Sequence, residues 1–368
     1  MPAVLLASLC VTLPIPFLSA SRFGDLCNWY NDHLHHAFAT WVFLHRGLAI
    51  YTEPFRTAAS VVRYPHRFLG DWADNPGMVY PPGVFVVFLP MALLGSWLPD
   101  MSMHAFGATG IAILLFYAHL TFGVFLLSSE LQPRGLRVLV AGALWLALMR
   151  AALDGFFDVV WLGAAAAMQL SLLRAKPSRA LVWFAAAAFT HFRAIVMAPL
   201  AVDALRRAIG RRPARDWPWG ALSLTAGLLA IAGVSFLLMY PVTANMRGAH
   251  PSTLSQIGTL RFWEIGLSGV LLAAGAYWSG GLVAAVTSAL VSVIALAEMT
   301  VYPTFWWHSS VCFAVLMLPG AVESVRRPAV LRVVGLVQLF ALEALVWADR
   351  RGGLFGLFAE FLNDFKLR

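Results

Sequence analysis

The chain alternates between long apolar segments and short polar stretches. Regular apolar segments cover residues 2–20, 104–127, 138–153, 155–173, 218–240, 264–278, 281–298, 305–320 and 331–347. A helix needs roughly 20 apolar residues to cross the hydrocarbon core of a bilayer. The pattern therefore predicts an all-α, polytopic integral membrane protein of about 10–12 membrane segments, with one domain over residues 1–368. No internal repeat and no separate soluble domain is evident in the sequence.

The first apolar segment, 2–20, has two interpretations. A cleaved signal peptide carries a basic region before its apolar core and small residues at its cleavage site. No basic residue precedes this segment, and Leu18 stands three positions before a cut after Ala20. We therefore expect this segment to be the first membrane helix.

Two further apolar segments do not fit a simple crossing. Residues 83–98 are few for a full span. Residues 180–203 lie between two basic stretches, 174–179 and 206–215, and a single crossing would place one of these outside, against the positive-inside rule. We expect 83–98 to dip into the membrane and return, and 180–203 to form two half-helices that meet near His191.

The first loop, residues 21–82, is long and polar. Residues 22–83 hold five of the eighteen acidic residues and five of the ten histidines. Apolar residues recur there at helical spacing, at Leu34, Phe38, Trp41 and Leu44. This spacing predicts an interfacial helix on the membrane surface, with Asp32 at its first turn as a cap and Gly47 as its stop. The last stretch, residues 350–368, is interpreted as an amphipathic tail on the surface.

Composition supports the membrane assignment and reduces the classes of binding partner to be considered. Hydrophobic residues make up 60% of the chain, charged residues 12%, and the mean hydropathy is +0.75, far from the values of soluble domains. The net charge of +8 comes from arginines clustered in short loops. Such clusters indicate residues that set membrane orientation or bind phosphate groups, in preference to a surface that binds nucleic acid. The three cysteines show no metal-ligand spacing and no disulfide framework.

This topology collects polar side chains on one side of the membrane. Acid, base and cationic candidates there are Asp32, Arg63, His66, Arg67, Asp71, Asp74, Asp154, Asp158, His191, Arg193, Arg247, His250, Arg261 and His308. Charged groups at membrane depth are costly and usually line a cavity.

Simpler interpretations of these residues stay open. Asp154 and Asp158 would share a helix face if their turn is helical, but they could equally form a helix-end turn that pairs with Arg150. His191 and Arg193 could be a buried local pair satisfied by backbone carbonyls.

The order of these motifs resembles a GT-C glycosyltransferase. Asn31-Asp32-His33 through Gly47-Leu48-Ala49-Ile50-Tyr51, and then Tyr80-Pro81-Pro82-Gly83, are similar to bacterial polyprenyl-phosphate-mannose-dependent mannosyltransferases. The stretch Thr190-His191-Phe192-Arg193 resembles the His-Phe-Lys element of the mannosyltransferase I family that builds glycosylphosphatidylinositol anchors. Trp306-Trp307-His308 resembles an aromatic-His element late in the bacterial group. The sequence departs from the family in having no acidic pair at Asp32 and arginine in place of lysine at 193.

The resemblance implies a GT-C helical bundle in the inner or plasma membrane, with its active site on the extracytoplasmic face. Such an enzyme moves a sugar, most often mannose, from a polyprenyl-phosphate donor to a hydroxyl of a glycolipid, polysaccharide or protein. Asp32 is then the general base of an inverting displacement. The groups expected to bind the donor phosphate are Arg193, His191, Arg67, Arg63, Arg261 and His308. The groups expected to line the substrate cavity are Tyr80, Asp74, Asp154, Asp158 and His36.

No metal or other cofactor is required by this interpretation. A divalent metal held by Asp32 and His36 is the less favoured alternative, because a polar helix face explains these residues as well. Membrane lipid is an expected partner and nucleic acid is not. Alternative functions are a flippase or transporter for polyprenyl-linked sugars, an outer-leaflet polysaccharide ligase, and a non-catalytic assembly subunit.

Overall fold

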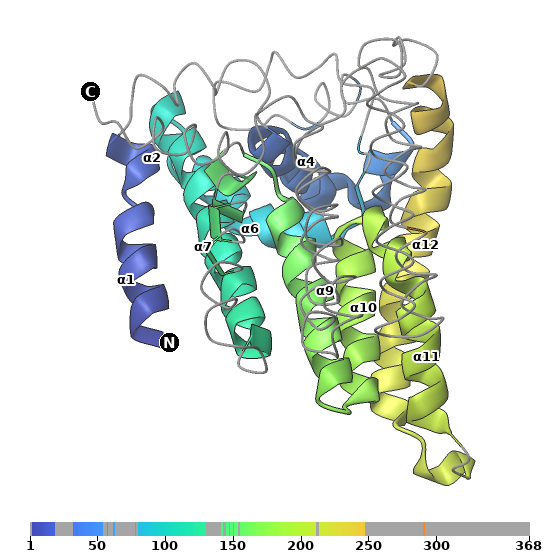
Figure 1. Ribbon diagram of the computed structural model, residues 1–368. Coiled ribbons are helices and arrows are strands. Elements are labelled where there is room, and N and C mark those ends of the chain that lie inside the picture. The colour runs from blue at the N-terminus through green and yellow to red at the C-terminus, as the bar shows by residue number, and fades with distance from the viewer. Residues whose placement is uncertain are drawn as a thin grey trace, which may run out of the picture.

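A computed structural model describes a helical protein (Figure 1). It describes residues 2–18, 32–53, 80–129, 151–153, 155–210 and 213–246, together with residues 57, 62, 78, 141, 142, 145, 146, 148, 149 and 290. Every regular element in these ranges is a helix, and none of these residues lies in a strand. The predicted all-α fold is therefore confirmed for this part of the chain. The expected spans between 264 and 347 and the tail 350–368 lie outside the described residues.

Helices of very different lengths make up the described part. The α-helices are α1 (Pro2–Thr12), α2 (Ile15–Leu18), α4 (Asp32–Arg46), α6 (Gly83–Trp97), α7 (Met103–Ser129), α9 (Asp158–Leu173), α10 (Pro177–Thr190), α11 (Ala198–Ile209) and α12 (Trp219–Met246). Short 3₁₀ helices are η1 (Gly47–Tyr51), η3 (Phe192–Met197) and η4 (Ala214–Asp216).

Two of these helices are long and apolar enough to cross a membrane. The qualifying stretches are His104–Leu127 in α7 and Trp219–Met239 in α12. Large apolar side chains of α12, such as Leu224, Ile231 and Leu237, are exposed. A helix with apolar residues on its exposed side as well as its buried side is typical of a lipid environment.

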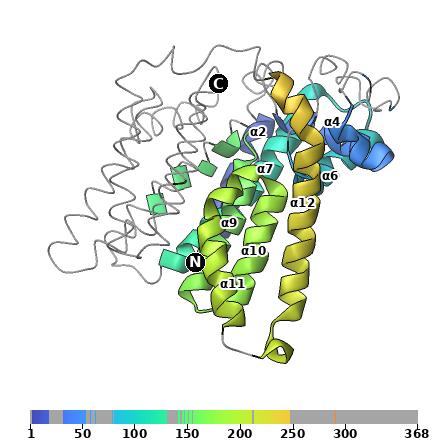
Figure 2. The ribbon, with the colours of Figure 1, turned by 90° about the vertical axis from the view of Figure 1, so that its right-hand side faces the viewer.

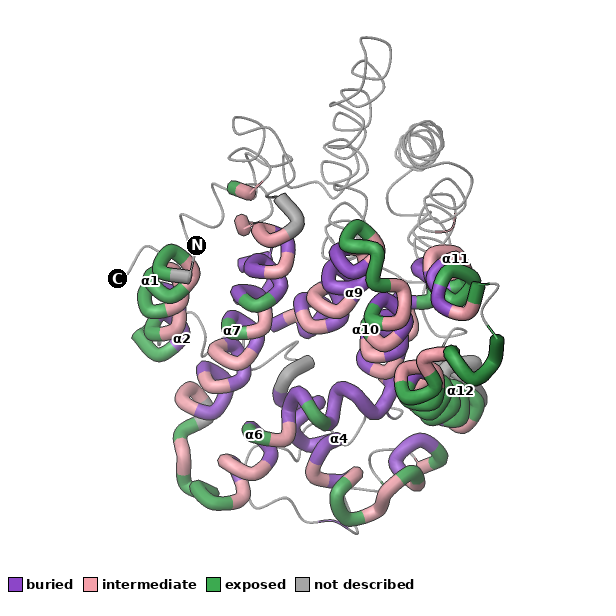
Figure 3. Tube along the Cα trace, turned by 90° about the horizontal axis from the view of Figure 1, so that it is seen from below, coloured by how far each residue is buried: buried purple, intermediate pink, exposed green. Residues whose placement is uncertain are grey.

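The long helices stand side by side while α4 and α6 lie across them. Figure 1 shows that the axes of α7, α9, α10, α11 and α12 are roughly aligned. Helices α4 and α6 lie nearer one end of this bundle. Figure 2 shows the same arrangement from the side, and in Figure 3 the long helices are viewed along their axes. We call the end that holds α4 the α4 end. The opposite end carries the α9–α10 turn and the α11–α12 connection, and we call it the basic end.

Segment 180–203 is broken as the loop charges predicted. Helix α10 ends at Thr190, the chain bends through His191 and η3, and α11 returns toward the basic end. Both flanking basic stretches therefore lie at the same end. The segment 83–98 forms one continuous helix, α6, which lies across α7 and does not turn back within its length, so the expected dip and return inside this segment is not seen.

Two sequence-based expectations need correction. The first apolar segment is not one continuous helix, because α1 ends at Thr12 and a turn at Leu13 and Pro14 precedes α2. Pro14 and Pro16 have no backbone N–H to continue the helical bonding of α1.

Helix α4 ends before Gly47 as predicted, but the described residues of its first half are buried inside the protein instead of presenting an exposed polar face. Gly47 has a φ of 58°, a conformation that glycine adopts without steric penalty. All residues from Leu34 to Thr40 are buried, including His35 and His36, whereas Leu44 on the expected apolar stripe is exposed. Residues 34–40 of α4 are thus buried, and the exposed residues among those described in this helix lie in its second half.

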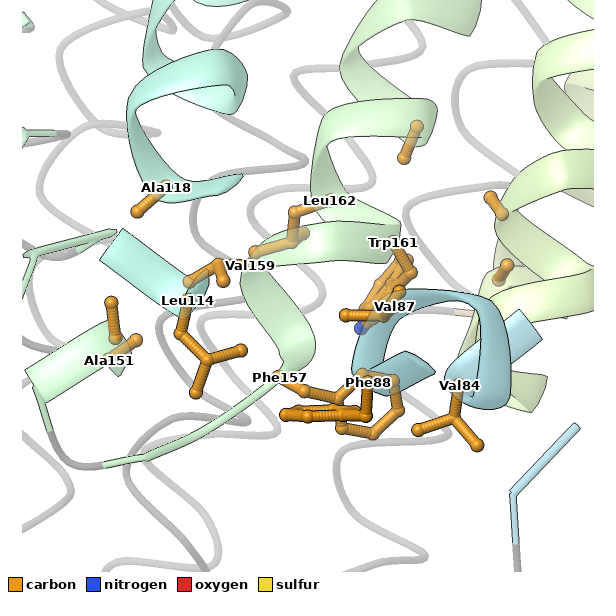
Figure 4. Packing of buried hydrophobic residues seen from close by; sticks show 14 of the residues in the cluster. Val84, Val87, Phe88, Leu114, Ala118, Ala151, Phe157, Val159, Trp161 and Leu162 are labelled. Carbon is orange, nitrogen blue, oxygen red and sulfur yellow. The ribbon is translucent and has the colours of Figure 1, made fainter. Parts of the chain in front are cut away.

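The core lies where α4, α6, α7 and α9 meet. Figure 4 shows Phe88 of α6, Leu114 of α7 and Trp161 of α9 among its members. All three side chains are fully buried. A further contact joins α7 to α9, because the Thr121 hydroxyl donates to the Val159 carbonyl at 2.7 Å. This core fixes the N-terminal end of α9 beneath α4.

Candidate functional site

A buried carboxylate at the start of α9 organises the α4 end. Asp158 is the first residue of α9 and is 4% exposed. Its Oδ1 accepts hydrogen bonds from Arg193 Nη1 at 2.9 Å and from Trp161 Nε1 at 2.8 Å. His191 Nε2 lies 3.6 Å from the same oxygen, which is too long for a good hydrogen bond. Two elements separated by 35 positions, the start of α9 and the break after α10, are thereby joined.

His191 takes part in this cluster as a neutral ring. Its Nδ1 accepts a hydrogen bond from the backbone N–H of Arg193 at 3.0 Å. An accepting nitrogen carries no proton, so the ring proton resides on Nε2, which is the atom nearest Asp158. The ring therefore caps the start of η3 and directs a dipole at the carboxylate.

The charges of Asp158 and Arg193 balance each other in a nearly dry environment. Their side chains are 5% and 14% exposed. Removing two charges from water is costly unless they are paired and hydrogen-bonded. Trp161 and the positive N-terminal end of α9 add further stabilisation to the carboxylate. The arrangement holds a cation at the α4 end in one fixed position.

Aromatic rings enclose the ionic cluster. The Tyr80 ring centroid lies 5.3 Å from that of His191, 4.9 Å from Phe157 and 4.9 Å from His36. The Phe157 ring stacks on His191 at 5.4 Å. These rings come from four separate parts of the chain, so the cluster is a junction of α4, the 80–83 segment, the start of α9 and the α10–α11 break.

Gly83 allows this junction to close. A Cβ atom placed on Gly83 would lie 2.5 Å from the carbonyl oxygen of Phe189 and 2.8 Å from Thr190 Cα. Only glycine lets the start of α6 approach the backbone of α10 this closely. The Tyr51 hydroxyl holds the same segment from the other side by donating to the Tyr80 carbonyl at 2.9 Å. The Tyr80-Pro81-Pro82-Gly83 motif thus has a structural role beside His191.

The structure brings together five of the residues expected to form the site. These are His36, Tyr80, Asp158, His191 and Arg193. Asp32 is the first residue of α4 and lies about 6 Å, or roughly one turn, before His36 along that helix, and its side chain lies outside the described part of the structure. The remaining expected residues also lie outside the described part, namely Arg63, Arg67, Asp74, Asp154, Arg261 and His308.

Asp158 differs from its expected setting. The turn at Gly155–Phe157 is not helical, so the condition under which Asp154 and Asp158 would share a helix face is not met, and Asp154 itself lies outside the described residues. Arg193 is bound by a carboxylate instead of by backbone carbonyls alone. The sequence reasoning missed Phe157 and Trp161, and it named Tyr51 only as the end of a motif, with no contact assigned to it. For Trp161, its position three residues after Asp158 was the available signal, because such pairs meet on a helix.

Metal ligands do not gather within the described ranges. No group of three or more His, Cys, Asp or Glu side chains with suitable geometry is present among those residues. The nearest set, Asp158 with His191, is occupied by the Arg193 guanidinium, and a cation in contact with the carboxylate opposes metal binding at this oxygen. The chemistry available to the described cluster is charge pairing and hydrogen bonding.

Comparisons of the chain with protein-family models, with curated proteins and with solved structures gave no match. The candidate site therefore rests on its own geometry.

Proposed function

We propose that this chain is an integral membrane glycosyltransferase that moves a sugar, mannose by resemblance, from a polyprenyl phosphate to an acceptor hydroxyl. The observation that carries the proposal is the junction at the α4 end. The first residue of α4 stands one turn before His36, and the Tyr80, Asp158 and His191 segments meet beside that histidine. Three described segments that carry the GT-C resemblance, the one beginning α4, the one at Tyr80–Gly83 and the one at Thr190–Arg193, are far apart in sequence yet share one end of the bundle.

The distribution of basic residues supports an extracytoplasmic position for the proposed site. The connections at the opposite end hold exposed basic residues, including Arg174, Lys176, Arg206 and Arg215. Basic loops favour the cytoplasmic side, so the α4 end is assigned to the extracytoplasmic side. A polyprenyl-phosphate sugar displayed on that leaflet would meet the junction at headgroup depth.

The residues have separate roles in the proposed reaction. The acceptor hydroxyl oxygen attacks the anomeric carbon, the bond from that carbon to the phosphate oxygen breaks, and polyprenyl phosphate leaves with the bonding electrons. The acceptor proton passes to the Asp32 carboxylate as general base. Arg193 supplies positive charge toward the departing phosphate, and Asp158 and His191 fix its direction. Asp158 and His191 are thus positioning residues.

The decisive experiment measures released polyprenyl phosphate. Purified protein is incubated with polyprenyl-phosphate mannose and other polyprenyl-phosphate hexoses, and the products are identified by mass spectrometry. We expect release that Asp32→Asn lowers by at least about 10²-fold without loss of folded protein. Asp216→Asn, at the basic end, is the matched control and should retain activity. An active Asp32→Asn protein would remove Asp32 from the mechanism.

A flippase is the second candidate, because α10 and α11 form a broken segment with polar groups at the break, a feature of transporter sites. Reconstituted vesicles separate the two functions. A flippase moves labelled donor between leaflets and leaves its glycosyl bond intact, whereas the transferase releases free polyprenyl phosphate.

A further inference from the structure

A cavity at the basic end lies far along the bundle from the candidate site. It has a volume of about 200 Å³ and is bounded by α7, α9 and α10. Its apolar walls come from Val124, Ala167, Leu170 and Trp183. Its remaining lining residues are polar, namely Ser171, Arg174, Lys176 and Arg179.

The cavity combines an apolar interior with a cationic rim. Arg174, Lys176 and Arg179 are all exposed, and none of them has an acidic partner at ion-pair distance within the described ranges. Two arginines farther along this end of the bundle are different, because Arg207 of α11 pairs with Asp203 at 2.6 Å and Arg215 of η4 lies 3.8 Å from Asp216. Positive charge at the cavity is therefore available to an outside anion.

The turn that carries these cations has a defined conformation. Ala175 has a φ of 52°, which is uncommon for a residue with a side chain. The backbone N–H of Lys176 donates to the Ser171 carbonyl at 2.8 Å, and that of Arg174 donates to the Leu170 carbonyl at 3.0 Å. These bonds fold the turn back onto α9, so the cations stay next to the cavity mouth.

We propose that this cavity binds the phosphodiester headgroup of an anionic phospholipid from the leaflet at the basic end. The inference relies on the membrane location contained in the proposed function. Three cations match a phosphate, and the volume is below the roughly 300–1,000 Å³ of sites that enclose a drug-sized ligand. The cavity thus accommodates a headgroup and not a whole lipid. Exposed apolar side chains beside it, Leu173 and Trp183, offer surface for the acyl chains.

The test compares two triple variants that lose the same charge at the same end. The first carries Arg174→Gln, Lys176→Gln and Arg179→Gln, and the matched control carries Arg206→Gln, Arg207→Gln and Arg215→Gln. Each full-length protein is titrated with phosphatidylglycerol in phosphatidylcholine nanodiscs, and retained phosphatidylglycerol is measured by native mass spectrometry after mild detergent extraction. We expect the cavity variant to need at least about tenfold more phosphatidylglycerol for half-saturation, and the control to change by less than about threefold.

A cavity-filling variant keeps the charges and tests the pocket itself. Ala167→Leu places a larger side chain on the apolar wall and should also weaken retention. Equal losses in the two triple variants, or unchanged retention in both the cavity variant and Ala167→Leu, would overturn the site. Inorganic phosphate at matched concentration should not displace the lipid, and full displacement would assign the site to free phosphate. None of these residues belongs to the candidate functional site, so missing transfer activity would count only against the proposed function.

Discussion

The buried ion pair between Asp158 and Arg193 gives the sharpest test of the site. The perturbation is a double-mutant cycle with Asp158→Asn, Arg193→Gln and the combined variant. Asparagine keeps an oxygen that can accept from Trp161 Nε1, so the cycle mainly removes charge and leaves the shape of the site. The pair is the link between α9 and the break after α10, and each single variant removes one side of that link.

The structure sets the size of the expected effect. At the 2.9 Å separation of Nη1 and Oδ1, two unit charges attract by about 6 kcal/mol at an effective dielectric constant of about 20. Desolvation offsets part of this attraction, and breaking a buried pair typically costs about 3–5 kcal/mol. The combined variant leaves two neutral amides that can hydrogen-bond to each other, so we expect it to cost about 1–2 kcal/mol. The coupling energy, which is the sum of the two single effects less the effect of the combined variant, should then be at least about 4 kcal/mol.

Denaturant titration in mixed micelles measures the free energy of unfolding once refolding has been verified. The matched control is the same cycle on Arg207 and Asp203, an i,i+4 pair whose arginine side chain is 60% exposed. That cycle should give a coupling of at most about 0.5 kcal/mol. A coupling below about 0.5 kcal/mol for Asp158 and Arg193 would show that the two side chains act independently, and it would refute their assignment as one structural unit.

Three further changes test other parts of the fold. Gly83→Ala should lower the free energy of unfolding by about 1–3 kcal/mol, because its Cβ would meet the Phe189 carbonyl oxygen at 2.5 Å. Ser8→Ala should cost about 1–2 kcal/mol, because the Ser8 hydroxyl contacts His119 Nε2 at 2.8 Å and ties α1 to α7. Burial lowers the pKa of His35 from 6.5 to about 4, so the unfolded chain takes up a proton first as the pH falls. Stability should fall between pH 6.5 and about 4 by up to about 3 kcal/mol, and His35→Gln should reduce this loss in thermal unfolding.

Controls for these changes lie on the same helices or in open surroundings. Gly227→Ala in α12 meets no atom within 4 Å and should be neutral or stabilise slightly. Cys10→Ala on α1 changes an exposed side chain and should leave stability unchanged. A Gly83→Ala protein as stable as the parent would contradict the close contact of α6 with α10. A pH dependence equal in His35→Gln and the parent would assign the acid sensitivity to other groups.

The sequence predicted the breaks in the helical pattern better than the contacts between helices. The break at His191 and the helix end before Gly47 followed from loop charge and from glycine chemistry, which act locally. The pairing of Asp158 with Arg193 depends on how α9 packs against α10, and nothing local at either residue specifies that partner. The burial of α4 was missed for a related reason. Its histidines are polar by composition, yet Phe88 and Phe157 provide ring surfaces that pack against His36.

The register of α9 against α10 links the two ends of the hairpin that these helices form. Asp158 opens α9 at the candidate site, and His191 follows α10 at the same level, whereas the turn that joins the two helices lies at the basic end. A shift of one residue in either helix would move its far end by about 1.5 Å and rotate it by about 100°, enough to separate the Asp158 carboxylate from Arg193. The turn with Ala175 at a φ of 52° joins the two helices, so we expect a change in its length to disturb the buried pair. A lipid headgroup held by the cations around this turn would stabilise the register from the opposite side of the bundle.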